Sequence, residues 1–261
     1  MTYFTENQAY AFGIDLSVYN VVPKPRQEPD FEQIAAHVPE VTFVGLRTGQ
    51  SWGYSDSMFR RYYDLAEQAG LCVLPYHVVF PGEPALKQMN ALLDILTGVD
   101  LDAVRLVLDV ELVHNQSRAM ITNTTLLCLE LLKSETGRFP ILYSRAGWVN
   151  QYLHICDLPK VDWWLAQYRW RKPFPAYTPE SPCPPQLPHG VNRWLIHQTA
   201  ERGPAIGGGS SYMDYNRWCG SKTDLWAYFG RQAEPAAREV RQPAPPRVSR
   251  LEQDALLMAE A

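Results

Sequence analysis

Short apolar runs alternate with amphipathic stretches along the chain as far as residue 153. The apolar runs have the length and the β-branched content of buried strands. The stretches between them place apolar side chains three or four residues apart, as a helix with one buried face requires. Five strand–helix pairs are expected, at residues 11–17 with 30–36, 41–47 with 55–70, 71–77 with 84–96, 104–111 with 123–132, and 139–144 with 146–153.

The alternation stops after residue 153. Strands are expected at residues 162–168, 193–199 and 211–216, and a single short helix is expected after them at 223–229. Between the first two strands, residues 173–188 are too rich in proline for a regular helix. Five βα units followed by three strands without full helices predict an α/β fold, an irregular TIM-like (β/α)5(β)3 barrel with a flexible C-terminal tail.

The composition divides the chain into three parts. Residues 1–10 form a polar N-terminal extension, residues 11–230 carry the barrel pattern, and residues 231–261 are rich in alanine, proline, glutamate and arginine. The last part is expected to be a linker or tail, in which residues 251–260 have the spacing of one short helix. Because such a helix is marginal alone in water, we expect it either to dock on a protein partner or to fray.

The overall composition is that of an ordinary globular protein, with 46% hydrophobic and 20% charged residues. A net charge of −4 gives no basic excess, so neither a nucleic acid nor an anionic membrane is an expected partner. No apolar stretch is long enough to span a bilayer. Residues 1–10 lack the basic start and apolar core of a signal peptide, so localisation stays open.

Cysteine and histidine spacing does not indicate a metal or redox site. The five cysteines are scattered without a CxxC pair, and a bridge between Cys183 and Cys219 is left open. The six histidines contain no HExxH pair. Asp109, Glu111 and His114 lie close in sequence but lack a second histidine at ligand spacing. We therefore expect no metal and no cofactor.

Four carboxylates lie at the ends of predicted strands. Asp109 and Glu111 are separated by one residue and therefore share a strand face. Asp15 and Asp214 end other predicted strands. In a parallel barrel the strand ends meet at one mouth, so the four acids can converge there. Crowded carboxylates push one another's pKa values apart, which glycoside hydrolysis requires. The alternative for each acid alone is that it caps a loop or pairs with an arginine.

A series of short motifs runs along the chain in a distinctive order. The motifs are Gly13-Ile14-Asp15-Leu16-Ser17, Ser55-Asp56-Ser57-Met58-Phe59, Tyr76-His77, Asp109-Val110-Glu111, Pro140-Ile141-Leu142-Tyr143, Trp164-Leu165-Ala166-Gln167-Tyr168, Gln198-Thr199 and Met213-Asp214-Tyr215-Asn216. From Ala11 to Phe229 the chain resembles glycoside hydrolase family 25, the Chalaropsis-type lysozymes (N-acetylmuramidases) of fungi, bacteria and bacteriophages. The fold that this resemblance implies is the irregular barrel that the hydrophobic pattern predicts.

The resemblance also implies roles for individual residues. Glu111 matches the general acid that protonates the leaving glycosidic oxygen, and Asp109 matches the acid that assists it. Asp15 and Asp214 match acids that line the same pocket and help to position substrate, water or the acetamido group of the sugar. The residues that match sugar-holding wall positions are Tyr76, Tyr143, Trp164 and Gln198. For the two aromatic residues Tyr76 and Trp164, ordinary packing at the barrel mouth is the alternative.

The chain departs from the family pattern in two loops at the predicted mouth. The family often has a Gln-Gly step after the first acid and serine, where this chain has Val18-Tyr19-Asn20. A Lys-Ala-Thr-Glu-Gly-like run commonly ends the second strand in the family, where this chain has Arg47-Thr48-Gly49-Gln50-Ser51. Sugar specificity is therefore less firmly predicted than the reaction.

Two functions from different classes remain open. One is hydrolysis of the β-1,4 bond between N-acetylmuramic acid and N-acetylglucosamine in the glycan strands of bacterial peptidoglycan, by a phage endolysin or a virion-borne enzyme. The alternative is a catalytically idle glycan-binding barrel that serves as a structural or assembly component. Retaining, inverting and substrate-assisted routes also stay open, because same-face neighbours on a strand lie about 6.6 Å apart and their side chains lean either way.

Overall fold

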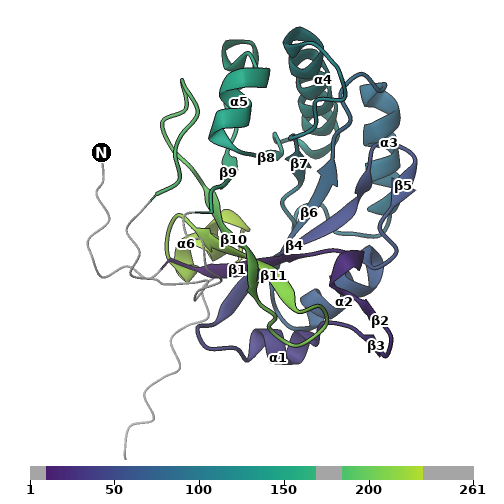
Figure 1. Cartoon of the computed structure of the whole chain (residues 1–261), viewed down its shortest axis with the longest axis vertical. Coiled ribbons are helices and arrows are strands. Elements are labelled where there is room, and N and C mark those ends of the chain that lie inside the picture. Colours follow the sequence, from purple (N-terminus) through teal and green to yellow (C-terminus); the bar gives the residue numbers. More distant parts are fainter. Residues whose placement is uncertain (1–9, 169–183, 232–261) are drawn as a thin grey trace, which may run out of the picture. The chain divides into compact units, whose positions relative to one another are not determined.

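A computed structural model describes residues 10–168 and 184–231, in which a closed ring of strands forms a barrel (Figure 1). In chain order the ring consists of β1 (Phe12–Leu16), β4 (Val41–Gln50), β6 (Cys72–Val78), β7 (Val107–Asp109), β8 (Ile141–Ser144), β9 (Trp163–Ala166), β10 (Ile196–Pro204) and β11 (Tyr212–Trp218). The ring closes because β1 pairs with both β4 and β11. Outside it, β5 (Tyr54–Ser55) extends β4, and β2 (Val22–Pro23) pairs with β3 (Arg26–Gln27).

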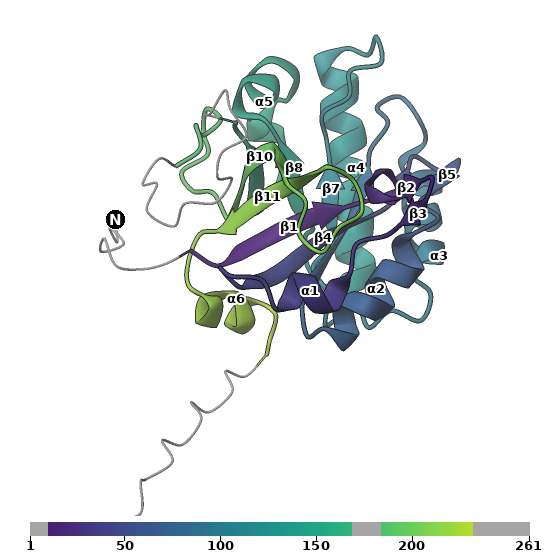
Figure 2. The ribbon, with the colours of Figure 1, turned by 60° about the horizontal axis from the view of Figure 1, so that its bottom comes forward.

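The helices follow the first five strands of the ring and lie outside it (Figures 1 and 2). Their bounds are α1 (Phe31–Ala35), α2 (Phe59–Gln68), α3 (Ala85–Ile95), α4 (Arg118–Thr136), α5 (Ala146–Tyr152) and, after the last strand, α6 (Lys222–Tyr228). The helix α4 is longer than predicted. It begins after Ser117, whose hydroxyl accepts a hydrogen bond from the backbone amide of Met120. It ends at Gly137, which has a left-handed backbone conformation. The predicted (β/α)5(β)3 barrel is confirmed.

The last strand of the ring is antiparallel to its neighbours, whereas a parallel strand was predicted. β11 is antiparallel to both β1 and β10, whereas the other pairings around the ring are parallel. Asp214 therefore lies near the start of its strand and not at the end, directly opposite Asp15 of β1. The expectation that Asp214 ends a parallel strand is wrong. The acid still reaches the mouth, because an antiparallel strand begins where its neighbours end.

The strand that leads to the carboxylate pair is shorter than residues 104–111. β7 covers only Val107–Asp109, and Glu111 follows it in the connection to α4. Two hydrogen bonds hold Val110 to the neighbouring strand: its amide donates to the carbonyl of Tyr143 (3.0 Å), and its carbonyl accepts from the hydroxyl of Ser144 (2.7 Å). Glu111 is thus anchored through its neighbour while its own side chain remains partly exposed.

Two glycines make room for large rings inside the barrel. A Cβ atom on Gly13 would lie 2.4 Å from the Phe43 ring, and one on Gly45 would lie 2.6 Å from the Trp164 ring, closer than carbon atoms approach. Both rings belong to a buried cluster that also includes Val107, Ile141, Ile196 and Trp218. Because side chains alternate along each strand, these residues fill the barrel interior below the mouth.

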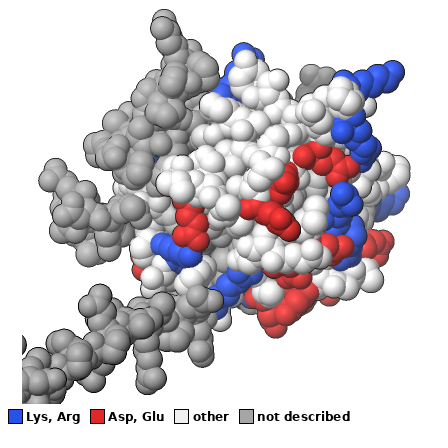
Figure 3. Space-filling view, turned by 90° about the horizontal axis from the view of Figure 1, so that it is seen from below, with Lys and Arg blue, Asp and Glu red and all other residues white. Residues whose placement is uncertain are grey.

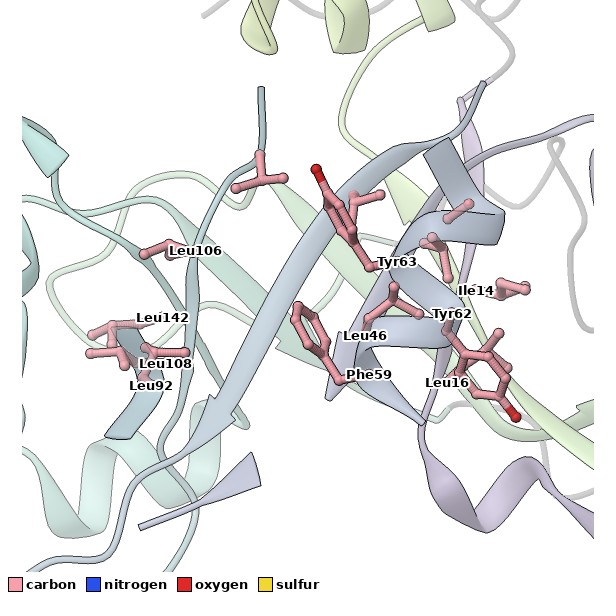
Figure 4. Packing of buried hydrophobic residues seen from close by; sticks show 14 of the residues in the cluster. Ile14, Leu16, Leu46, Phe59, Tyr62, Tyr63, Leu92, Leu106, Leu108 and Leu142 are labelled. Carbon is pink, nitrogen blue, oxygen red and sulfur yellow. The ribbon is translucent and has the colours of Figure 1, made fainter. Parts of the chain in front are cut away.

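A second apolar cluster lies between the strands and the helices. Figure 4 shows Phe59 and Tyr62 of α2 beside Leu46 of β4 and Leu16 of β1. All four side chains are at most 2% exposed. The strands are therefore covered on both faces, which explains why their sequences are nearly continuous apolar runs.

The surface charge and the helices of the described residues concern two partners considered from the sequence, nucleic acids and membranes. On the face that Figure 3 shows, acidic and basic side chains lie among uncharged ones, with no continuous basic surface among the described residues. Over the same residues, no helix is both long enough and apolar enough to cross a membrane. Cys183, most of the proline-rich segment and nearly all of the predicted tail lie outside the described residues.

Candidate active site

One cavity of about 160 Å³ opens at the mouth of the barrel. All eight predicted site residues line this cavity. They come from β1, β6, β7, β8, β9, β10, β11 and the connection after β7. The lining residues are Asp15, Tyr76, Asp109, Glu111, Tyr143, Trp164, Gln198 and Asp214. The structure thus brings all eight together, while their individual roles stay predictions.

A larger hollow of about 870 Å³ lies elsewhere, between residues 150–163 and 189–193. Among the described residues that line it, Asp162 is the one acid. It pairs with Arg193 at 2.8 Å and accepts a hydrogen bond from the Tyr228 hydroxyl at 3.0 Å. A carboxylate held in this way has no second acid with which to divide acid and base roles. We therefore place the chemistry in the smaller cavity.

Gln198 connects the two sides of the small cavity. Its Nε2 donates to Oδ2 of Asp15 (2.9 Å) and of Asp214 (3.3 Å). Its Oε1 accepts from the hydroxyls of Tyr143 (2.8 Å) and Tyr168 (2.6 Å). The amide is thus hydrogen-bonded at both ends, which fixes its orientation and that of the two acids.

The carboxyls of Asp15 on β1 and Asp214 on β11 are hydrogen-bonded to each other. Asp15 also accepts a hydrogen bond from Asn216 Nδ2 (2.8 Å), and the Asn216 Oδ1 accepts one from the Trp164 indole (2.8 Å). Burial raises the pKa of Asp15, and hydrogen bonds from Asn216, Gln198 and Asp214 oppose that rise. Burial, together with the charge of Asp15 and the hydrogen bond to it, raises the pKa of Asp214 to about 10. The hydrogen bond between the two carboxyls thus favours a protonated Asp214 as the donor and Asp15 as the acceptor.

Asp109 has an unused acceptor atom. The residue is 8% exposed, and within residues 10–168 and 184–231 its Oδ1 is buried without a hydrogen-bond partner. Burial raises the pKa of Asp109 well above its usual value, and the charges of Glu111 and Asp15 add to the rise. A buried polar atom without a partner is costly. A substrate or a water molecule in the cavity would supply the missing hydrogen bond.

Glu111 is the most accessible acid of the cavity. Its side chain is 32% exposed, and its Oε2 lies 3.8 Å from Nη2 of Arg145, which precedes α5. Burial raises the pKa of Glu111, whereas the charge of Arg145 opposes the rise. An accessible carboxyl with a raised pKa keeps its proton at higher pH and can deliver it to a substrate, which suits a general acid.

Three site residues were not singled out from the sequence. Asn216 lies two positions after Asp214 on the same strand face, a spacing that indicates a shared environment. Tyr168 belongs to the Trp164 motif but follows the end of β9, and Arg145 directly follows β8. No sequence signal shows that Arg145 approaches Glu111, because that contact joins two different loops.

No metal site is indicated near these residues. Among the residues that the structure describes, no three His, Cys, Asp or Glu side chains are grouped as metal ligands. The His114 ring stacks on Phe80, with the ring centroids 4.2 Å apart, and His114 does not line the cavity. The set of Asp109, Glu111 and His114 considered from the sequence is therefore not assembled.

Replacing Asp214 with asparagine should stabilise the protein more as the pH rises. The pKa of Asp214 is raised from 3.8 to about 10, so its favourable contribution is complete at acid pH and is lost as the pH rises toward 10. Asparagine stays neutral and can still donate to Asp15. At pH 8 we expect a Tm increase of roughly 2–4 °C, the shift that about 1 kcal/mol produces in a chain of this size. Scanning calorimetry at pH 4 and pH 8 checks this; a Tm difference that does not depend on pH would contradict it.

Comparison with known proteins identifies the family. The family model described as Glycosyl hydrolases family 25 matches residues 14–207. The uncharacterized protein YegX of Escherichia coli (strain K12) is 25% identical over 230 residues, which cover 83% of this chain and 72% of that protein. The autolytic lysozyme of Clostridium acetobutylicum is 26% identical over 146 residues, covering 55% of this chain and 43% of that protein.

Solved structures share the fold. A bacterial lysozyme from Streptomyces coelicolor superposes with a TM-score of 0.65 at 21% identity, over 84% of this chain and 96% of that chain. A family 25 glycosyl hydrolase from Bacillus anthracis superposes with a TM-score of 0.68 at 18% identity, over 86% and 94% of the two chains. The resemblance predicted from the motifs is thus confirmed by the match over residues 14–207. The chain belongs to glycosyl hydrolases family 25 and is a glycoside hydrolase.

Proposed function

We propose that this protein is a muramidase that hydrolyses the β-1,4 bond between N-acetylmuramic acid and N-acetylglucosamine in peptidoglycan. The observation that carries the proposal is that Asp15, Asp109, Glu111 and Asp214 line one cavity at the mouth of a family 25 barrel. The partial match to an autolytic lysozyme supports the choice of substrate. The phage or virion setting stays a prediction.

The proposed chemistry begins at Glu111. Its carboxyl is the most accessible of the four acids, which supports a role in protonating the glycosidic oxygen as the bond breaks. The free Oδ1 of Asp109 then has a partner in the acetamido N–H of the sugar or in the attacking water. Asp15, Asp214 and Gln198 hold this side of the cavity in one hydrogen-bonded arrangement.

Clearing of a suspension of purified cell walls, with release of reducing sugar, tests the proposal. The wild-type protein should produce both signals on at least one wall type. Absence of both signals on several wall types would contradict the proposal. Binding of glycan strands without any turnover would indicate the alternative, a catalytically idle glycan-binding barrel.

Replacing Arg145 with glutamine should move the alkaline limb of the pH–activity profile to higher pH. Glu111 acts in its protonated form, and the Arg145 charge lowers the pKa of Glu111. Without that charge the pKa of Glu111 rises, so the active form persists to higher pH. The profile of kcat against pH measures this shift. Arg145→Lys is the control, because it keeps the positive charge and should leave the alkaline limb at its wild-type pH. A limb that stays in place or moves to lower pH in Arg145→Gln would contradict the assignment of Glu111 as the acid.

A further inference from the structure

The catalytic cavity is too small to hold more than a short part of a glycan strand. Its volume of about 160 Å³ is below the roughly 300 Å³ at which pockets begin to enclose a drug-sized ligand. A strand of linked sugars bound there must therefore continue across the rim. The residues on the rim decide how strongly the outer sugars are held.

An exposed aromatic ring stands on this rim, in the turn that follows β1. Tyr19 is 77% exposed, although it lies only four positions after the cavity residue Asp15. The centroid of its ring lies 4.6 Å from Cζ of Arg47. One face of the ring is thus stacked on the guanidinium, and the high exposure leaves the opposite face open to solvent.

The guanidinium beneath this ring is fixed. Arg47 is 8% exposed, and its Nε donates to Oδ2 of the buried Asp56 at 2.8 Å. On β4 it pairs in register with Tyr76, which lines the cavity. A second exposed ring, that of Tyr54, has its centroid 5.4 Å from Cζ of Arg47. Arg47 therefore holds two aromatic rings beside the cavity.

The turn that carries Tyr19 is also held in place from three directions. The Ser17 hydroxyl accepts a hydrogen bond from the Tyr19 amide (3.3 Å), and Oδ2 of Asp56 accepts one from the Val18 amide (3.0 Å). Asn20 Nδ2 donates to the hydroxyl of Ser210 (3.2 Å), in the loop before β11. A large exposed ring that is held rigid loses little entropy when a ligand stacks on it.

We propose that Tyr19, backed by Arg47, is a stacking subsite for a pyranose ring of the glycan strand outside the catalytic cavity. This inference rests on the proposed function, because it takes the occupant to be the strand that is cleaved. The C–H face of a pyranose packs on the negative face of an aromatic ring, as other apolar groups do. Tyr19 and Arg47 lie in the two segments where this chain departs from the family pattern. The first segment follows β1, whereas the second, predicted as a loop, is mostly the end of β4 in the structure.

The experiment measures binding and turnover of purified peptidoglycan glycan strands that have been fractionated by length. Binding is measured in the Glu111→Gln background, so that it does not depend on cleavage. Tyr19→Ala should weaken binding of long strands about five- to tenfold and leave binding of the shortest fragments unchanged. Tyr19→Phe keeps the ring and should bind as the parent does. Leu127→Ala removes an exposed apolar side chain from α4 and serves as the matched surface control.

In the background with Glu111 intact, Tyr19→Ala should raise KM for long strands by a similar factor and leave kcat unchanged. Equal binding of long strands by Tyr19→Ala and its parent would overturn the subsite. A loss that is the same for long and short fragments would also overturn it, because Tyr19 would then act inside the cavity. The muramidase proposal is judged separately, on cleavage of walls by the wild-type protein.

Discussion

The Glu111→Gln variant is expected to have a kcat on peptidoglycan about a thousandfold below that of the wild-type protein. Glutamine has nearly the same shape but cannot protonate the glycosidic oxygen. The fold should not change, because the side chain is 32% exposed and its ion partner Arg145 lies 3.8 Å away, with a half-exposed side chain of its own. Steady-state kinetics on soluble peptidoglycan fragments measure the loss, and thermal unfolding at the same pH checks the fold.

The control for this variant is Glu83→Gln, which changes a carboxylate outside the cavity to an amide. Glu83 accepts a hydrogen bond from the Trp52 indole at 3.0 Å and does not line the cavity. This variant should keep the wild-type kcat. If Glu111→Gln retained a kcat within about threefold of the wild-type value, Glu111 would not be the general acid.

The Asp109→Asn variant is expected to lose activity and gain stability together. We expect kcat to fall about a hundredfold, because an amide cannot take up or release a proton beside Glu111 as the Asp109 carboxyl can. We also expect Tm to rise by roughly 2–4 °C, because a buried carboxyl with an unpartnered oxygen is replaced by a neutral amide. Parallel kinetics and calorimetry measure the two effects.

Asp102→Asn is the matched control for Asp109→Asn, since the Asp102 side chain is 94% exposed and lies before the same strand. It should change neither kcat nor Tm appreciably. A lower Tm for Asp109→Asn would mean that the Asp109 carboxylate stabilises the fold, and an unchanged kcat would remove it from the catalytic machinery. Either outcome would contradict the role proposed for Asp109.

The sequence was sufficient to predict the barrel and the residues at its mouth, because side-chain alternation is a local property. On β4, for instance, Phe43 and Gly45 point into the barrel while Val44 and Leu46 pack against the helices. The same alternation places Asp15 and Tyr76 on the inner face near the ends of their strands, and Gln198 where the parallel pairing of β10 with β9 ends.

Features that depend on pairing between distant segments could not be predicted in this way. The reversed direction of β11 is set by its pairing with β1 and β10, and nothing in the local pattern of residues 211–216 encodes it. The contact of Arg145 with Glu111 and the four hydrogen bonds of Gln198 likewise join separate loops and strands. Polar partners of this kind leave no periodic signal.

Mass spectrometry of the soluble products released from purified peptidoglycan tests the proposed reaction most directly, because it reports the bond that is cut and the sugar at the new reducing end. We predict fragments that end in reducing N-acetylmuramic acid for the wild-type protein, formed about a thousandfold more slowly by Glu111→Gln. Fragments that end in reducing N-acetylglucosamine, or equal rates of product formation by both proteins, would contradict a muramidase whose acid is Glu111.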